Sequence, residues 1–342
     1  MKAVLLCGLG SIGQRHARNL RTLYGPSIRL GAFRQSTISG SIREDVQGID
    51  DEPAEKRYNI ETFTDLKQAL QEKWDAVFIT NSIHRHLPVA LEAARAGFPL
   101  LIEKPLGSQW DEAQELARVC AEKKLPVMVA FQLRFHPQLV ALKQRLASGE
   151  LGRVLHGAFH FGEYLPGMHP YEDYRQTHMA RREQGGGVIN CLSHELDLAL
   201  WLVGQPRSVF AGGGKLTELE LDVEDTVNIT ASVEKPAALI DIHLNFWDRP
   251  PRRHFSLQTE AVTVDFDYLK STLIIRHREK PEETQTLTPF VRNRMFLDEL
   301  QHFAECVREH REPQPGLADG LRALRFAIAA HESLATHKEI TF

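Results

Sequence analysis

The sequence predicts two domains: an N-terminal α/β domain with a doubly wound parallel sheet, and a C-terminal α+β domain with an open-faced, mostly antiparallel sheet. In the first part, short apolar runs alternate with segments of helical periodicity. After residue 149, strand-like runs separated by turns follow one another and few helices intervene. The chain has 342 residues, which is enough for two domains of ordinary size. We place the division between residues 125 and 126.

The elements follow from these two patterns. Strands that are apolar throughout are typical of a parallel sheet covered on both faces. In the first domain we expect strands at 3–7, 28–33, 75–80, 99–102 and 126–130, and helices at 64–73, 87–96 and 109–124. In the second domain we expect strands at 153–163, 208–212, 226–233, 238–246, 254–259, 262–266 and 272–277, and helices at 187–203, 293–309 and 316–336.

Composition excludes several classes of function. Basic side chains number 41 and acidic ones 45, so the net charge of −4 gives no attraction to nucleic acid or to an anionic membrane. The chain has no signal-peptide pattern and no apolar run long enough for a membrane span, from which we expect a cytoplasmic protein. Four dispersed cysteines without a CxxC pair predict neither disulfides nor a thiolate metal site, and we predict no metal.

A glycine pattern directly follows the first expected strand. Gly8, Gly10 and Gly13 form GxGxxG, in which the first glycine permits a tight turn, the second lets a pyrophosphate approach, and the third lets helix and strand pack closely. The phosphates would lie at the helix N-terminus, beside Ser11 and Ile12. The pattern at this place favours a dinucleotide site, and the alternative is a glycine turn that is purely structural.

Arg34 bears on the choice between NAD and NADP. It follows the second strand about 20 residues beyond Gly13, where an acidic residue for the ribose of NAD is expected. A guanidinium suits a 2′-phosphate, and the neutral polar residues at 35–37 add further hydrogen-bonding groups. The sequence therefore favours NADP, while an Arg34 that stacks on the adenine or is simply solvated would still permit NAD.

Polar residues follow two further strands of the expected parallel sheet. Ligands of such sheets bind beyond the carboxyl ends of the strands, so both groups of residues should face one crevice. An ammonium group there can polarise a substrate oxygen and manage its proton, and we assign this role to Lys104. The candidate cofactor contacts at these strand ends are Thr80, Asn81, Ser82, His86, Glu103 and Lys104.

A second cluster lies in the expected helix 187–203. Asn190, His194 and Asp197 are four and three residues apart, so on a continuous helix they share a face. The imidazole could exchange a proton with a substrate hydroxyl, Asn190 could orient the substrate, and Asp197 could hold the helix or the imidazole tautomer. A helix cap with an incidental histidine is the structural alternative.

Five motifs in this order resemble one known family. They are GxGxxG, EKPLG at 103–107, FQLRFHP at 131–137, GGGVINCLSHELDLALWLVG at 185–204 and DGLRALRFAIAAHES near the end. Together they are similar, over nearly the whole chain, to the Gfo/Idh/MocA oxidoreductases, named after glucose–fructose oxidoreductase and inositol dehydrogenase. The resemblance implies a Rossmann domain, an open sheet domain, a nicotinamide cofactor, and oxidation or reduction of a sugar or cyclitol.

The resemblance also assigns residues. The lysine of the family's EKP motif matches Lys104, and the histidine of its GG…DxxxH motif matches His194. The family's aspartate falls on Asn190, whose amide cannot ionise, so Lys104 and His194 are left to carry the proton transfer.

The stretch from residue 164 to 187 is the least generic part of the chain. Its aromatic rings and donors are of the kind that line carbohydrate sites, and it is similar to family members associated with bacterial surface-sugar pathways. The alternative is a surface loop that wraps the sheet. The candidate substrate contacts, besides Asn190 and His194, are Arg134, Tyr164, His169, Tyr174 and Arg175.

The expected function is an NAD(P)-dependent oxidoreductase that moves a hydride between nicotinamide and a sugar, nucleotide sugar or cyclitol. Lys104 would polarise the oxygen, and His194 would transfer or position the proton. Two alternatives, both found among relatives, are a glycoside hydrolase that keeps its dinucleotide bound and a non-catalytic NAD(P) sensor. The family resemblance further suggests a homodimer or homotetramer.

Overall fold

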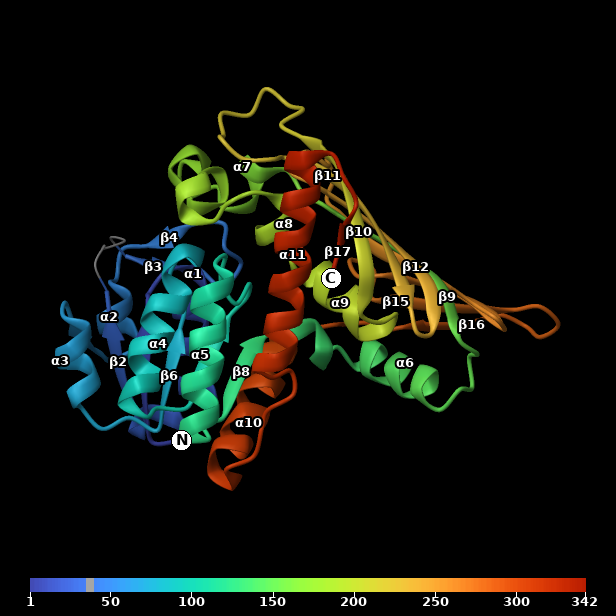
Figure 1. Ribbon diagram of the computed structural model, residues 1–342. Coiled ribbons are helices and arrows are strands. Elements are labelled where there is room, and N and C mark those ends of the chain that lie inside the picture. Colours follow the sequence, from blue (N-terminus) through green and yellow to red (C-terminus); the bar gives the residue numbers. More distant parts are fainter. Residues whose placement is uncertain (35–39) are drawn as a thin grey trace.

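The computed structural model describes residues 1–34 and 40–342 and contains a six-stranded parallel sheet in its N-terminal part (Figure 1). The strand order β5-β2-β1-β6-β7-β8 is that of a doubly wound sheet, with β1 at the point where the order reverses. The sheet continues to residue 130, beyond the predicted division at 125 and 126. Its strands are β1 (Ala3–Cys7), β2 (Arg29–Phe33), β5 (Ile60–Phe63), β6 (Ala76–Ile79), β7 (Leu100–Glu103) and β8 (Val127–Ala130).

Helices cover both faces of this sheet, as predicted from its apolar strands. One apolar layer joins the sheet to α4 and α5, and the other joins it to α1 and to α10, which comes from the far end of the chain. The helices are α1 (Ser11–Tyr24), α2 (Ala54–Arg57), α3 (Leu66–Gln71), α4 (His86–Ala96), α5 (Trp110–Lys123) and α10 (Asn293–Glu309); a small hairpin is formed by β3 (Ser41–Ile42) and β4 (Ile49–Asp50).

The C-terminal part is built on a nine-stranded sheet with the order β16-β15-β14-β13-β9-β12-β11-β10-β17. Within this sheet, only β9 and β12 pair in parallel among the described residues, so the expected mostly antiparallel sheet is confirmed. The strands are β9 (Val154–Gly162), β10 (Pro206–Gly214), β11 (Thr226–Glu234), β12 (Ala237–Asn245), β13 (Arg252–Thr259), β14 (Val262–Asp267), β15 (Thr272–His277), β16 (Glu283–Thr286) and β17 (Ile340–Thr341).

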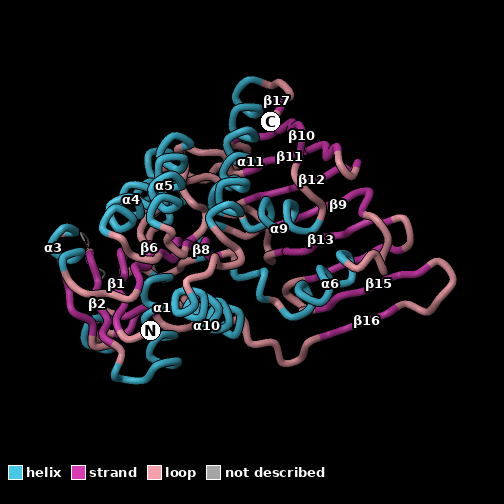
Figure 2. Tube along the Cα trace, turned by 60° about the horizontal axis from the view of Figure 1, so that its bottom comes forward, coloured by secondary structure: helices cyan, strands magenta, loops and turns pink. Residues whose placement is uncertain are grey.

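Helices lie on one face of this second sheet (Figure 2). The face is covered by α6 (Pro137–Ala147), α9 (His194–Leu202) and α11 (Leu317–Thr336), and α11 stands between the two sheets in Figure 1. The opposite face presents Phe210 from β10 and Leu239 and His243 from β12, two strands separated by β11, and the first two are about half exposed. Two short helices, α7 (Leu165–Met168) and α8 (Val188–Cys191), lie in the long connections.

The helix predicted at 187–203 is in fact two helices, α8 and α9. In a continuous helix the carbonyl of Cys191 would accept from the backbone N–H of Glu195. Instead the Cys191 carbonyl accepts from Lys104 Nζ at 2.8 Å, and the Glu195 N–H donates to Leu192 at 3.3 Å. The prediction that Asn190 and His194 share one helix face is therefore wrong, because the helix breaks where Lys104 docks.

Candidate functional site

The glycine turn after β1 is packed on two sides and open on the third. A Cβ atom on Gly8, whose φ is +117°, would lie 2.7 Å from the backbone of Thr80 and Asn81. A Cβ on Gly13 would collide with the carbonyl of Gly8, whereas, apart from its two chain neighbours, no atom of the described residues lies within 4 Å of the position that a Cβ on Gly10 would take. The first and third glycines thus serve packing, and the second leaves free space for a ligand.

The open side of the turn fits the pyrophosphate of a dinucleotide. The helix α1 begins at Ser11, so its first N–H groups face this side without intrahelical acceptors. Thr80 holds the turn from behind, because its hydroxyl donates to the carbonyl of Gly8 at 2.8 Å. Thr80 therefore shapes the predicted site through the turn. Ser11 and Ile12 would hold the phosphates through their backbone.

Arg34 lies at the end of β2, as the sequence predicts, but it is not an isolated cation. Its guanidinium forms an ion pair with Glu55, and its side chain is only 9% exposed. Burial lowers its pKa. The neighbouring residues 35–37, which the sequence suggested as further cofactor contacts, lie outside the described residues. A carboxylate and a guanidinium thus stand together where the adenosine ribose is expected.

Two predicted cofactor contacts turn toward the protein instead. The ring of buried His86 bridges two loops, with Nδ1 2.8 Å from the Pro105 carbonyl and Nε2 2.9 Å from the Asn81 carbonyl. The Glu103 carboxylate contacts Nε2 of buried His16 at 2.8 Å. Both side chains support the strand ends rather than face the crevice, because each of these polar groups is buried and needs a protein partner.

The other two strand-end residues remain available. The side-chain oxygen of Asn81 is buried and has no hydrogen-bond partner among the described residues. Ser82 directly precedes the turn Ile83–Arg85. An unpaired buried acceptor is costly, so a ligand donor at Asn81 would be stabilising.

Lys104 reaches from the end of β7 into the second half of the chain. Its Nζ donates to the Cys191 carbonyl, three residues before His194. Burial lowers the pKa of the Lys104 ammonium, and nearby Arg253 lowers it further, while Glu103 and Glu195 oppose the shift. A lysine held in this way exchanges its proton closer to neutral pH than an exposed lysine does.

His194 is the first residue of α9 and is buried close to Lys104. Burial holds its pKa well below the usual range, and the charges of Lys104, Arg253 and Arg292 act in the same direction. The amide nitrogen of Gln132 lies 3.1 Å from Nε2, so Nε2 accepts and the ring proton lies on Nδ1. Nδ1 is buried and has no partner among the described residues.

Three predicted site residues are used inside the protein. Asp197 binds Arg134 through two hydrogen bonds, of 2.6 and 3.0 Å, and the same guanidinium also pairs with Asp319 at 3.1 Å. Asp197 therefore holds neither the imidazole tautomer nor a substrate. The Asn190 amide donates to the Gly185 carbonyl at 3.1 Å, and its oxygen lies 3.4 Å from His331 Nε2. All these contacts are within the protein.

The stretch 164–187 folds against the first domain. The guanidinium carbon of Arg249 lies 3.4 Å from the centre of the Tyr164 ring, and His169 stacks on Tyr171. The side chain of Ser11, at the start of α1, lies near enough to Tyr171 to act on the pKa of its hydroxyl. This stretch therefore reaches the glycine turn, which sequence reasoning did not anticipate.

The last two candidate substrate contacts of this stretch, Tyr174 and Arg175, are bound to other residues of the protein. The hydroxyl of Tyr174 accepts from the backbone of Glu220 at 3.1 Å, and Arg175 is an exposed side chain paired with Asp173 and Glu220. Both are engaged on the outer side of the stretch.

Four residues near Lys104 and His194 were missed. Gln132 contacts His194, the buried pair Glu195–Arg253 lies beside both, and Glu163 is electrostatically coupled to Arg253. Gln132 lies in a motif that was recognised, so its neighbourhood could have been suspected. Glu195 directly follows His194 in another recognised motif, whereas Arg253 on β13 and Glu163 after β9 come from distant strands, and no local pattern singles out those two.

Comparison with known protein families divides the chain into the same two parts as the fold does. Residues 2–131 match the oxidoreductase family with an NAD-binding Rossmann fold, and residues 139–263 match the Gfo/Idh/MocA C-terminal domain. The chain belongs to the Gfo/Idh/MocA oxidoreductase family. Among curated relatives, scyllo-inositol 2-dehydrogenase (NAD(+)) of Bacillus subtilis is 25% identical over an alignment of 340 residues that covers 95% of this chain and 92% of that protein.

Solved structures of similar fold also cover the chain. Levoglucosan dehydrogenase in complex with NADH superimposes with a TM-score of 0.84 at 18% identity, covering 99% of this chain and 98% of that one. UDP-N-acetylglucosamine 3-dehydrogenase GnnA from Acidithiobacillus ferrooxidans gives 0.76 at 22% identity, covering 97% of each chain. The combination of a Rossmann sheet and an open second sheet in this Gfo/Idh/MocA member is thus shared with sugar dehydrogenases.

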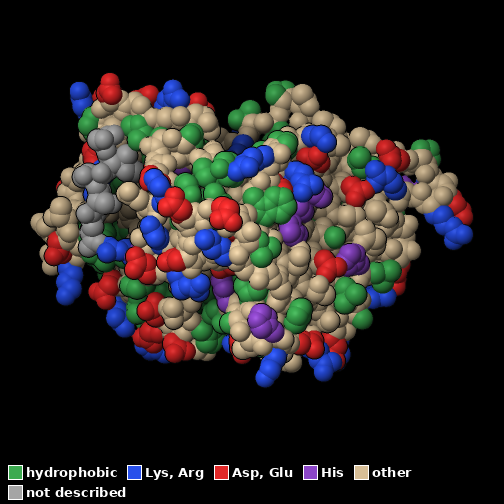
Figure 3. Space-filling view, turned by 90° about the horizontal axis from the view of Figure 1, so that it is seen from above, with side chains coloured by type: hydrophobic (Ala, Val, Ile, Leu, Met, Phe, Trp, Pro, Cys, Tyr) green, Lys and Arg blue, Asp and Glu red, His purple; other side chains and the backbone are tan. Residues whose placement is uncertain are grey.

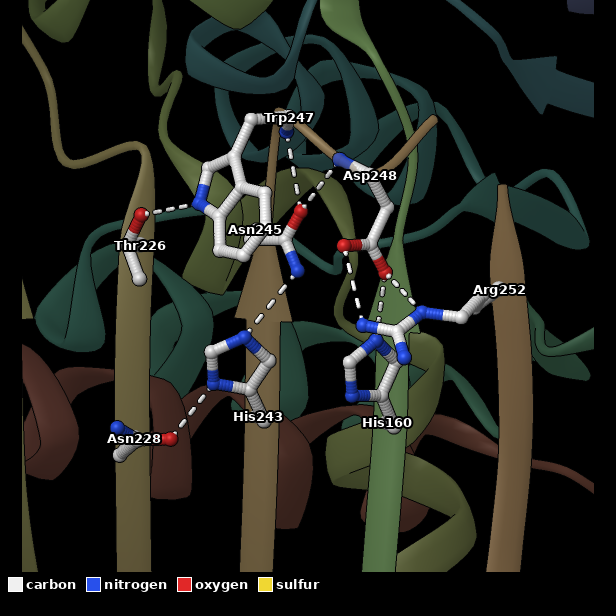
Figure 4. Close-up of polar contacts among 8 residues, drawn as sticks. All are labelled: His160, Thr226, Asn228, His243, Asn245, Trp247, Asp248 and Arg252. Carbon is white, nitrogen blue, oxygen red and sulfur yellow. Dashed lines mark hydrogen bonds and ion pairs between the residues drawn. The ribbon is translucent and has the colours of Figure 1, made fainter. Parts of the chain in front are cut away.

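A separate polar network lies on the uncovered face of the second sheet (Figure 4). Asp248 accepts from Arg252 and contacts His160 Nε2 at 2.7 Å, while His243 bridges Asn228 and Asn245. The described residues contain no group of three or more His, Cys, Asp or Glu side chains arranged to hold a metal ion. These histidines are therefore paired with neighbouring side chains across the strands.

The molecular surface agrees with the balanced composition. In the view of Figure 3, acidic and basic side chains are interspersed without a continuous patch of one sign. Among the described residues, no helix is both long and apolar enough to cross a bilayer.

Proposed function

We propose that this Gfo/Idh/MocA member transfers a hydride between a nicotinamide cofactor and a carbinol or carbonyl carbon of a sugar, nucleotide sugar or cyclitol. The observation that carries the proposal is the pairing of two unusual groups. Lys104 has a lowered pKa, and His194 has a buried Nδ1 without a partner among the described residues, three residues from the carbonyl that Lys104 binds. When bound, the cofactor supplies or takes up the hydride.

Lys104 is proposed to exchange the proton of the substrate oxygen. Its ammonium form donates to a carbonyl oxygen during reduction, and its neutral form accepts the hydroxyl proton during oxidation. His194, which stays neutral, would donate from Nδ1 to the same oxygen and so position it. Since Asn190 cannot ionise and contacts the turn at Gly185, it is given no proton to carry.

The cofactor is proposed to be held by the glycine turn and the end of β2. The free space at Gly10 and the start of α1 would take the pyrophosphate. Arg34 favours the 2′-phosphate of NADP, while its partner Glu55 is the kind of acceptor that a 2′-hydroxyl of NAD requires. We therefore expect NAD to be accepted and keep the preference for NADP as a prediction for the assay below.

The test is cofactor reduction, followed at the nicotinamide absorbance, with NAD and NADP and a panel of cyclitols, sugars and nucleotide sugars. Lys104→Met should lower turnover by at least about 100-fold with little change in cofactor affinity, because the substituted side chain can neither donate nor accept a proton. Lys67→Met, an exposed lysine on α3, is the matched control and should leave turnover unchanged.

Each other outcome has a defined meaning. Unchanged turnover in Lys104→Met would remove this residue from the mechanism. Release of a free sugar without net change of absorbance would indicate the glycoside hydrolase. Cofactor binding without turnover across the panel would indicate the non-catalytic sensor.

We also propose that the protein is a cytoplasmic homodimer or homotetramer that associates through the uncovered sheet face. The half-exposed side chains of Phe210 on β10 and Leu239 on β12, which lie on the same face with β11 between them, support this surface, since large exposed apolar groups favour burial.

A further inference from the structure

Two arginines approach the ring of Phe296 where α1 meets the start of α10. The guanidinium carbon of Arg15 lies 4.9 Å from the ring centre, and that of Arg292 lies 5.9 Å from it. Arg15 is one turn into the helix that follows the glycine turn, and Arg292 directly precedes α10. Two cations from opposite ends of the chain therefore meet at one place.

Their charges are balanced only in part by the protein, since Glu44 and Glu103 act on Arg15, and Glu163 on Arg292, without forming ion pairs with them. Within the described ranges, no carboxylate forms an ion pair with Arg15 or Arg292, and the Arg15 guanidinium donates to the side-chain oxygen of Asn293 at 3.3 Å. Burial lowers the pKa of Arg15 to about 10, and the nearby charges of Arg292 and Arg18 contribute. Arg15 is partly buried beside the exposed Arg292, and the approach of two like charges where one is partly dehydrated is unfavourable until an anion joins them.

The place borders the proposed reactive centre. The charge of Arg292 acts on His194 and on Glu163. On the side of α1, Tyr171 lies near Ser11, which is one helical turn before Arg15 and on the same face. A ligand at the two arginines would thus lie between the glycine turn, the stretch 164–187 and the imidazole.

We infer that Arg15 and Arg292 form an anion-binding subsite beside the reacting carbon, and that the substrate is a carbohydrate carrying a carboxylate or phosphate group. This inference rests on the proposed function. Guanidinium groups bind both anions through paired N–H donors, and an anion would relieve the repulsion between the two cations. A neutral sugar would gain neither contribution.

Binding without turnover tests the inference. Calorimetric titration of the wild-type enzyme saturated with NADH compares methyl β-D-glucuronide with methyl β-D-glucoside, which differ in one carboxylate, and includes inorganic phosphate as a third probe. We expect at least one anionic probe to bind at least about tenfold more tightly than the glucoside, a difference of about 1.4 kcal/mol. Arg292→Gln should remove this preference.

The control variant is Arg294→Gln, an exposed arginine on the same helix that is already paired with Asp298. It should retain the preference, and NADH affinity should stay within about twofold in both variants. Arg15→Gln should behave as Arg292→Gln does; if it fails to fold, the exposed Arg292 still carries the test.

Two results would overturn the subsite. One is equal binding of the glucuronide, phosphate and the glucoside. The other is a loss of NADH affinity in Arg292→Gln, which would assign the arginines to the phosphates of the cofactor. Because no step of this experiment requires turnover, failure of the proposed reaction and failure of the subsite remain distinguishable.

Discussion

At the scale of single residues, the sequence locates the groups with local signatures and misses the partners that come from elsewhere. Gly8, Gly10 and Gly13 have distinct packing that matches their predicted roles, and Lys104 lies at its strand end beside His194. The sequence could not reveal that Glu103 is bound to His16, because this contact depends on how α1 packs on β7.

Lys104 should set the pH dependence of sugar oxidation. Its pKa lies below the ordinary value of 10.5, and oxidation needs the neutral amine, so kcat/KM should rise with pH and level off below pH 10.5. Activity is lost as pH falls through the lowered pKa, where the amine becomes protonated. Lys104→Arg should abolish this rise of kcat/KM with pH and lower the rate of oxidation by at least about 100-fold, since a guanidinium stays protonated. Initial rates between pH 6 and 10 check this. If kcat/KM of the variant still rises with pH, the titration belongs to another group.

At the scale of elements, periodicity predicted most strands and most of the long helices, although it missed α6, and it failed where a tertiary contact decides. The edge strand β5 was missed because only its two end residues are buried. The break between α8 and α9 was missed because the competing donor, Lys104, is 87 residues away from the carbonyl that it takes. Local pattern cannot report such a contact.

The packing of α10 on the first sheet leaves one carboxyl group without a partner. Glu299 is fully buried, neither of its oxygens has a hydrogen bond within the described part of the chain, and burial together with Glu103 raises its pKa well above 4.5. The folded state therefore holds a proton that the unfolded state releases above about pH 4.5. Stability from this group is complete below that pH and is lost as pH rises toward the folded pKa.

Glu299→Gln should remove this loss. Relative to the wild type, the free energy of unfolding of the variant should increase by about 1.4 kcal/mol per pH unit above pH 4.5, until the folded pKa is reached. Urea denaturation from pH 5 to 8 measures the difference, with Glu305→Gln on the exposed side of the same helix as control. Parallel pH curves for Glu299→Gln and the wild type would contradict the raised pKa.

At the scale of the whole molecule, the two ends of the chain build one body. Leu300 and Phe303 of α10 and Leu324 of α11 lie in the apolar layers of the N-terminal sheet, while α11 also covers the second sheet. The sequence indicated these helices and their apolar faces but not which sheet they cover, because an apolar stripe fits either surface. The Lys104–Cys191 contact then joins the halves at the site.

The uncovered face of the second sheet should hold the oligomer together. Phe210→Arg places a charge among the cross-strand side chains of that face and should reduce the molar mass in solution to that of a single chain. Leu269→Arg, at a somewhat more exposed apolar residue in the turn after β14, is the control and should leave the mass unchanged. Light scattering after size-exclusion chromatography gives the masses. A wild-type mass of one chain would remove the proposed assembly.

The central claim is that Lys104 and His194 act on one reacting oxygen, and a double-mutant cycle on kcat/KM tests it most directly. Groups that act as a unit show strongly non-additive effects, so Lys104→Met combined with His194→Ala should be at most about tenfold slower than the slower single variant. Two rate losses that simply multiply in the double variant would mean that the amine and the imidazole work independently, and this would contradict the proposed mechanism.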